Sequence, residues 1–272
     1  MTQSFRAACV QMRTGLDIDR NVRDAGALIR DAASQGATFI STPEMTALFE
    51  GEGAALLAKA KPEAEDTALP RFRALAEELG VWLHIGSMAI KLSDTQCANR
   101  SFLIGPDGRV RATYDKIHMF DVQIGDGQVY RESSRYRPGE RIAVVAAAGT
   151  NVGLSICYDL RFAYLYRAMA KAGAKVLTVP AAFTKTTGEA HWHVLLRARA
   201  IETGCFVVAA AQCGRHENGK DTFGHSLIVD PWGRILAEGG VDPGVFIAEI
   251  DPRLSDEARA KIPVLTHDRP FQ

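Results

Sequence analysis

Two short segments of the chain carry nearly the same pattern, although they lie far apart in the sequence. Residues 36–43 read GATFISTP and residues 173–180 read GAKVLTVP, and each follows a helix-like stretch. In a second pair, residues 103–110 and 227–235, turn residues separate two strand-like runs. Chance similarity between short segments is the alternative. If the echoes are real, the chain folds into two similar halves, each a sheet with helices on one face.

Each such sheet has a second apolar face that must be covered, and the sheet of the other half is the available partner. Apolar runs alternate with helix-like stretches along all 272 residues, and no linker rich in Ser, Gly or Pro marks a boundary. We therefore expect one domain over residues 1–272, of the α/β class, built as a four-layer α-β-β-α sandwich.

Composition excludes several classes of partner. The chain has 32 basic and 32 acidic residues, so no net field attracts nucleic acid or an anionic membrane. No apolar run approaches the ~20 residues that span a bilayer, and the first residues enter a strand-like segment without a signal-like stretch. Five scattered cysteines without Cys-x-x-Cys spacing argue against a disulfide framework and a zinc site. We expect a cytoplasmic protein with free thiols.

Cys157 is the strongest candidate for a reactive group. It follows the apolar run 152–156 and precedes a charged, aromatic segment that can open a helix, so it lies at the C-terminal end of a buried strand. Glu44 and Lys116 also follow strand-like runs, and strand ends are where α/β proteins place their chemistry. Taken alone, Cys157 reads better as a small core residue. Its combination with Glu44 and Lys116 favours a site.

Three ordered motifs carry a resemblance to a known family. They are Pro43-Glu44, the Tyr-x-Lys-x-His motif of residues 114–118, and the segment SICYDLRF of residues 155–162. Together they resemble the signatures of the nitrilase superfamily of carbon–nitrogen hydrolases, over nearly the whole chain. The similarity is densest between residues 173 and 232, toward the deaminated glutathione amidase branch. The resemblance implies the nitrilase-type sandwich, a Glu-Lys-Cys triad, no cofactor and no metal.

Under this resemblance Cys157 is the nucleophile and Glu44 is the base that takes the thiol proton. The Lys116 ammonium favours the thiolate and, with the backbone N–H of Tyr158, stabilises the oxyanion. Glu132 matches a further acidic residue that positions Lys116 and the attacking water. A loop carboxylate paired with a neighbouring arginine is the alternative for Glu132.

The expected substrate is a small carboxylate-bearing amide, such as deaminated glutathione or an ω-amide of an oxo acid. The expected substrate-binding residues are Tyr158, Phe183 and Thr184, and the polar loop 213–221 is a candidate flap beside them. Two other readings stay open. One is hydrolysis of an N-carbamoyl amine, and the other is a binding protein on this fold without chemistry.

Helix-like residues 185–203 contain charged side chains that we interpret as structural. His191 and His193 are two apart, so they face different directions and do not chelate one metal together. Arg199 and Glu202 are spaced for an intrahelical pair, and Arg197 is read as structural too.

The segment after Cys157 departs from the family pattern and suggests self-association. Residues 163–164 are Ala-Tyr where the family has Pro-Glu, a departure that bears on the substrate more than on the chemistry. Residues 162–169 are rich in aromatic and apolar side chains, which are enriched at interfaces. We expect a homodimer or higher homo-oligomer, although an ordinary amphipathic helix packed on its own sheet is the alternative.

Overall fold

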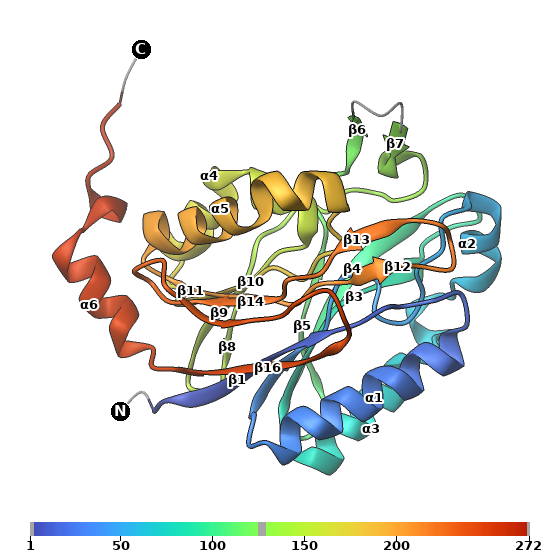
Figure 1. Cartoon of the computed structure of the whole chain (residues 1–272), viewed down its shortest axis with the longest axis horizontal. Coiled ribbons are helices and arrows are strands. Elements are labelled where there is room, and N and C mark those ends of the chain that lie inside the picture. Colours follow the sequence, from blue (N-terminus) through green and yellow to red (C-terminus); the bar gives the residue numbers. More distant parts are fainter. Residues whose placement is uncertain (1–2, 125–128, 271–272) are drawn as a thin grey trace.

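Two six-stranded sheets form the centre of the computed structural model, which describes residues 3–124 and 129–270 (Figure 1). In spatial order, the first sheet contains β16 (Gly244–Ile250), β1 (Phe5–Gln11), β2 (Phe39–Ser41), β3 (Trp82–Lys91), β4 (Cys97–Ile104) and β5 (Val110–Asp115). The second contains β15 (Ile235–Glu238), β14 (Leu227–Val229), β11 (Phe206–Ala209), β10 (Val176–Thr178), β9 (Thr150–Leu154) and β8 (Ala143–Ala147).

The two sheets share one topology. Three parallel strands, β1-β2-β3 or β9-β10-β11, are flanked on one side by one antiparallel strand and on the other by an antiparallel pair. The echoing segments occupy equivalent places, since β2 and β10 are the central parallel strands. The second pair of echoes forms the β4–β5 and β14–β15 hairpins. The predicted two-half architecture is therefore confirmed.

Helices cover the outer face of each sheet, so the four-layer prediction is also confirmed. In Figure 1, α1 (Ile18–Ser34) and α3 (Leu69–Leu79) lie on the first sheet, and α4 (Ala163–Lys171) and α5 (Lys185–Thr203) lie on the second. Ile29 and Phe72 belong to an apolar cluster with strand residues of the first sheet. A second cluster contains Phe39 of the first sheet, Val207 of the second and Trp192 of α5, so it fills the space between the sheets and beneath α5.

Local signals explain where these helices begin and end. The Asp17 carboxylate caps α1 by accepting the backbone N–H of Arg20 at 2.7 Å. Gly204 ends α5 in the left-handed region, with φ of 60°. Helix α4 begins at Ala163 without a side-chain cap on its first turn, which is the place where the sequence departs from the family pattern.

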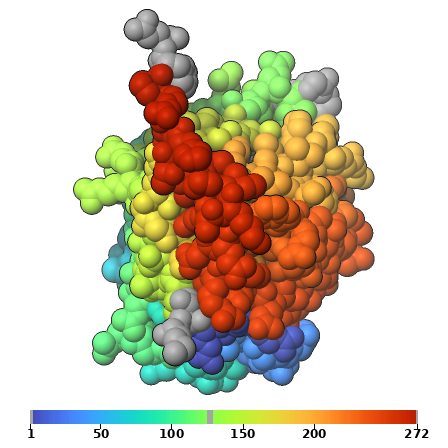
Figure 2. Space-filling model, turned by 90° about the vertical axis from the view of Figure 1, so that its left-hand side faces the viewer, coloured from blue at the N-terminus to red at the C-terminus, as the bar shows by residue number. Residues whose placement is uncertain are grey.

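The remaining elements lie around the sandwich. They are α2 (Gly53–Lys59), α6 (Arg253–Lys261), the ribbon of β6 (Asp121–Gln123) with β7 (Val129–Arg131), and the ribbon of β12 (Cys213–Arg215) with β13 (Asp221–Phe223). The C-terminal segment, red in Figure 2, runs over the side of the sandwich. It is fastened there by Arg259, whose guanidinium donates to Ala174 O at 2.6 Å, and by Asp256, which pairs with Lys175. No helix in the described ranges has the length and apolar character needed to cross a bilayer.

One glycine lets the strand ends of the two sheets approach closely. A Cβ atom on Gly86 of β3 would lie 2.1 Å from Thr42 O and 2.4 Å from Pro180 Cβ. No side chain fits in that space, so glycine is required here for close approach of backbone to backbone. The segments that follow β2 and β10 therefore meet over Gly86.

Candidate active site

The C-terminal ends of parallel strands from both sheets converge on one site. Glu44 follows β2 of the first sheet, whereas Cys157 and Ala182 follow β9 and β10 of the second. Lys116 comes directly after β5. The equivalent ends of the two halves thus bring together side chains that are far apart in the sequence.

Lys116 lies between two carboxylates. Its Nζ atom is 2.9 Å from Glu44 Oε1 and 2.9 Å from Glu132 Oε2. The side chains of Lys116 and Glu44 are 2% and 4% exposed, so this ion pair is almost completely shielded from water. Glu132 also accepts the backbone N–H of Phe120 at 2.7 Å, which fixes its carboxylate. Glu132 is therefore held by Lys116, and the alternative pairing with a neighbouring arginine is not what the structure shows.

Asn99 of β4 is a member of this cluster that sequence reasoning missed. Its Nδ2 donates to Glu44 Oε1 at 2.9 Å and to Glu132 Oε1 at 3.2 Å, so one amide bridges the two carboxylates. In the sequence, Asn99 is one of three consecutive polar residues in this strand, so nothing distinguishes it from Arg100 and Ser101.

Cys157 occupies a strained turn at the end of its strand. Its φ of 49° lies in the left-handed region, which is uncommon for a residue with a side chain, and its N–H donates to Pro180 O at 2.9 Å. The thiol hydrogen bonds to the Glu44 carboxylate. The second Glu44 oxygen accepts the backbone N–H of Ala182 at 2.8 Å. The backbone segment after β10 of the second sheet thereby holds both Cys157 and the carboxylate of Glu44.

Asp159 explains why the residues around Cys157 and Lys116 form recognisable motifs. Its carboxylate accepts the Tyr114 hydroxyl at 2.7 Å, the His118 Nδ1 at 2.6 Å and the backbone N–H of Ile156 at 3.0 Å. The segments that carry Lys116 and Cys157 are thus tied to each other through one buried carboxylate. We interpret these three partners as scaffold for the site.

Charge and burial act on the three central groups in different directions. Burial and the Glu44 carboxylate raise the pKa of Cys157 well above its usual value, although Lys116 lowers it. Burial raises the pKa of Glu44, but the Lys116 ammonium outweighs burial and the pKa is lowered. The pKa of Lys116 is raised, because two carboxylates outweigh its desolvation. Lys116 thus favours the thiolate in the direction expected from the sequence, but burial and Glu44 outweigh it, so the net pKa of the Cys157 thiol is raised.

A cavity of about 770 Å³ opens onto this cluster. Its lining includes Cys157, Glu44 and Lys116, and also Tyr158, Phe183 and Thr184, the residues expected from the sequence to contact substrate. Residues 215 and 218–222 line it as well, so the loop 213–221 lies beside the site as expected.

Basic side chains dominate the mouth of the cavity. Among the residues that the structure describes, and apart from the buried cluster, the lining includes five basic and two acidic residues: Arg131, Arg135, Lys185, Arg215, Lys220, Glu50 and Asp221. The two acids are already paired, Glu50 with Lys59 and Asp221 with Arg215. Lys220 lies over the rings of Phe49 and Tyr130, and burial and the charge of Arg135 lower its pKa.

The charged residues of α5 have the structural contacts expected of them. Arg199 pairs with Glu202 at 2.7 Å and donates to Leu160 O at 2.9 Å, while Arg197 donates to Gly233 O. His191 contacts Arg161, whereas His193 contacts Glu238, so the two histidines do face different directions.

Comparison with known proteins agrees with this geometry. Carbon-nitrogen hydrolase is the family that matches, over residues 6–260. The chain is 41% identical over 268 residues to the deaminated glutathione amidase of Synechocystis sp. (strain PCC 6803 / GT-S), with 97% of each chain covered. The C. elegans NitFhit protein has a TM-score of 0.92 at 35% identity, covering 98% of this chain and 66% of that one.

A solved amidase shows a modified cysteine in the same fold. In a mutant of the amidase from Nesterenkonia sp. AN1, the active-site cysteine carries the product of Michael addition of acrylamide. That structure has a TM-score of 0.80 at 28% identity and covers 95% of this chain and 98% of its own. The chain described here belongs to the carbon–nitrogen hydrolase family and is an amidase of the nitrilase fold.

Proposed function

We propose that the protein hydrolyses the amide bond of a small carboxylate-bearing amide, such as deaminated glutathione or an ω-amide of an oxo acid. The observation that carries this proposal is one cavity that joins a buried thiol, carboxylate and ammonium to a basic mouth. The buried thiol, carboxylate and ammonium suit attack on an amide, and the basic mouth suits an anionic substrate.

In the proposed first step, Cys157 Sγ attacks the amide carbonyl carbon while Glu44 takes the thiol proton. Because the resting thiol is protonated, transfer to Glu44 accompanies the attack. The carbon–nitrogen bond then breaks, Glu44 returns the proton to the leaving nitrogen, and a thioester remains on Cys157. Water, deprotonated by Glu44, attacks the thioester, and the thiol is restored as the product acid leaves.

The remaining residues of the cluster have supporting roles in this proposal. Lys116 and the backbone N–H of Tyr158 stabilise the oxyanion of each tetrahedral intermediate, and loss of one such donor costs about 3 kcal/mol of barrier. Glu132 holds Lys116 and positions the attacking water. Its contact with Lys116 at 2.9 Å supports this assignment.

Lys220 and Arg135 are the proposed contacts for the substrate carboxylate. The pKa of Lys220 is lowered mainly by its burial and also by the charge of Arg135, so the two neighbouring cations repel each other in the mouth of the cavity. A bound carboxylate relieves this repulsion and accepts charge-assisted hydrogen bonds from both. Phe183 and Thr184 line the same cavity and complete the proposed substrate contacts.

A single substrate comparison tests the function. The purified chain is incubated with deaminated glutathione, an ω-amide of an oxo acid, an N-carbamoyl amine and a neutral amide, and ammonia, amine and carbon dioxide are measured. We expect ammonia or amine without carbon dioxide, from a carboxylate-bearing substrate. Release of carbon dioxide supports the alternative function, hydrolysis of an N-carbamoyl amine. Turnover of none of the four, with no labelling of Cys157 by an electrophile, indicates a binding protein.

We also propose that the protein is a homo-oligomer and is cytoplasmic. Tyr164 of α4 is 66% exposed and Val194 of α5 is 67% exposed, which supports an interface over these helices. Leu165, Tyr166 and Met169 are buried in the protein itself, so only part of the apolar segment after Cys157 is free for a partner. All five cysteines are free thiols, which supports a reducing compartment.

A further inference from the structure

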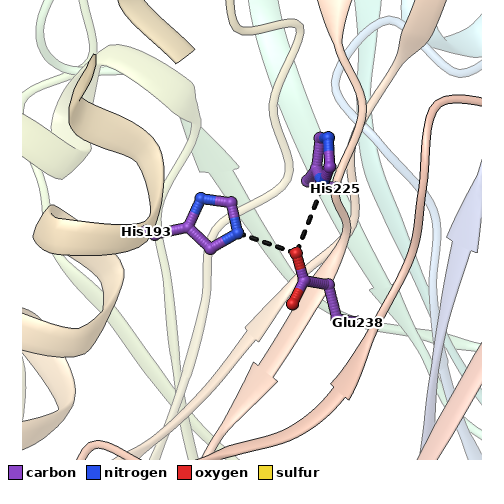
Figure 3. A group of neighbouring side chains, drawn as sticks. All are labelled: His193, His225 and Glu238. Carbon is purple, nitrogen blue, oxygen red and sulfur yellow. Dashed lines mark hydrogen bonds and ion pairs between the residues drawn. The ribbon is translucent and has the colours of Figure 1, made fainter. Parts of the chain in front are cut away.

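A cluster of two imidazoles and one carboxylate lies outside the cavity lining described above. His193 of α5, His225 in the connection between β13 and β14, and Glu238 at the end of β15 point toward one another (Figure 3). Glu238 Oε1 lies 2.8 Å from His193 Nε2 and 3.2 Å from His225 Nδ1. One ligand atom from each of the three residues lies within 4.8 Å of the others.

We propose that His193, His225 and Glu238 bind a divalent transition-metal ion of the zinc type, which fastens α5 to the second sheet. Two imidazoles and a carboxylate are a donor set that such ions prefer. Zinc bonds of about 2.1 Å at tetrahedral angles place ligand atoms about 3.4 Å apart. Two of the three separations, 2.8 and 3.2 Å, need only small side-chain movements to reach that value, and the ligand atoms of the two histidines lie within 4.8 Å of each other.

The three side chains are held in place by contacts that do not involve a metal. His225 has a φ of 52°, its N–H donates to Gly240 O at 2.9 Å, and its carbonyl accepts the Trp192 indole N–H at 2.7 Å. The ring of Phe223 stacks on His225 at 4.4 Å between centroids and meets the edge of His193 at 5.9 Å. Ligands held in this way lose little freedom when an ion binds.

Protonation of the cluster is compatible with metal binding. The same Glu238 oxygen contacts both His193 Nε2 and His225 Nδ1. An ionised carboxylate only accepts hydrogen bonds, so both imidazole nitrogens that face it carry protons. When an ion binds, each of these protons moves to the other ring nitrogen or leaves to solvent, and the freed lone pairs bind the ion.

The surface position of the cluster leaves room for water as a further ligand. The side chains of His193, His225 and Glu238 are 32%, 26% and 38% exposed. An ion there joins α5, the connection after β13, and β15. Thr222 of β13 lines the catalytic cavity, so the ion also steadies one wall of the cavity at a distance. This assignment does not depend on the substrate proposed above.

Zinc titration of the full chain tests the site, on a Cys157→Ala background that removes the cavity thiol as a competing ligand. We expect one zinc ion per chain by calorimetry, and a Tm increase of about 5 °C or more at zinc 100-fold above Kd. Co²⁺ should give the visible absorption of a site with nitrogen ligands. Glu238→Gln and His193→Ala should each weaken zinc binding about tenfold or more.

Two further variants make the result decisive. His225→Asn removes the imidazole but keeps a residue that tolerates the left-handed conformation, so a fold failure is avoided. His267→Ala removes an exposed histidine of the C-terminal segment and should leave zinc binding unchanged. Equal zinc affinity in Glu238→Gln, His193→Ala, His225→Asn and the His267→Ala control overturns the proposal, as does a wild-type site that binds no zinc. The amidase activity of His193→Ala is measured in zinc-free buffer as well. This measurement distinguishes failure of the proposed amide hydrolysis from failure of the zinc site.

Discussion

The Cys157 thiol donates a hydrogen bond to the Glu44 carboxylate across the boundary between two sheets, since Glu44 follows β2 and Cys157 follows β9. Glu44 has its cation, Lys116, within its own half of the sandwich, but the thiol comes from the other half. The pair of Glu44 and Cys157 forms only when both sheets are docked, so the catalytic site is assembled by correct docking of the two sheets.

Cys157→Ala should abolish turnover while leaving the fold intact, because the thiol is the proposed nucleophile and its volume is small. Cys157→Ser should also be nearly inactive, since Glu44 is too weak a base for an alcohol. Amine release measures activity, and circular dichroism with a thermal scan controls for folding. Retention of a tenth of the wild-type rate in Cys157→Ala would contradict the covalent route.

Lys116→Met should lower kcat/KM by about 100-fold or more through loss of oxyanion stabilisation. It should also slow alkylation of Cys157 at a given pH, because Lys116 lowers the pKa of this thiol. The variant leaves the Glu44 and Glu132 carboxylates buried without their cation, so its urea midpoint must be measured alongside. An alkylation rate whose pH dependence matches the wild type would mean that Lys116 does not act on the thiol.

Asn99→Asp should move the acidic limb of the kcat/KM against pH profile to higher pH. A third carboxylate beside Glu44 and Glu132 disfavours their ionised forms and raises the pKa of Glu44. Asn99→Ala removes the same hydrogen bonds without adding charge, so it serves as the matched control. If both variants lose activity equally and neither shifts the acidic limb of the pH profile, Asn99 supports the fold and does not set the pKa of Glu44.

His84 should make the protein sensitive to mild acid. Its imidazole lies in the core between the hydroxyls of Ser41 and Ser101, and burial lowers its pKa to about 3. The unfolded chain binds the proton below about pH 6.5, whereas the folded chain stays neutral. The resulting stability is present above pH 6.5 and is lost as the pH falls toward 3.

Between pH 7.5 and 5.5 this single group should cost about 1.4 kcal/mol of unfolding free energy. Urea melts at the two pH values measure the loss, and His84→Gln should reduce it whatever its effect on absolute stability. An identical loss in His84→Gln would assign the acid sensitivity to other groups, of which His216 is the next candidate because burial lowers its pKa too.

Tyr164→Asp combined with Arg167→Glu should yield monomers of reduced activity if the segment after Cys157 forms a subunit contact. Arg167 donates to Val264 O at 2.8 Å and pairs with Asp268, so part of its role is to hold the C-terminal segment. Tyr164→Asp alone separates the two effects. Sedimentation of the wild-type chain as a monomer at micromolar concentration would rule out the oligomer.

Much of the architecture and the cluster was predictable because both rest on local patterns. The strands before Glu44 and Cys157 are short apolar runs, the strand before Lys116 is an alternating strand-like run, and the echo between residues 36–43 and 173–180 indicated two equivalent halves. The net direction of the Cys157 pKa was not predictable, since it depends on burial and on distances to two carboxylates.

Contacts between distant segments could not be predicted either, because they also depend on distances in the folded chain. Nothing near Asn99 in the sequence indicates that its amide bridges two carboxylates. Likewise, the sequence relates His193 only to His191, its neighbour on the same helix, whereas its partners in space are His225 and Glu238.

The pairing of β1 with β16 delays completion of the first sheet during synthesis of this protein. Strand β1 is synthesised long before β16, yet residues 5–11 find their antiparallel partner only in residues 244–250. At about 5–20 residues per second, synthesis of the intervening chain takes on the order of 10 to 50 seconds. Throughout that interval one side of β1 offers unpaired backbone groups. The nascent first half is then most exposed to misassembly and to chaperone contact.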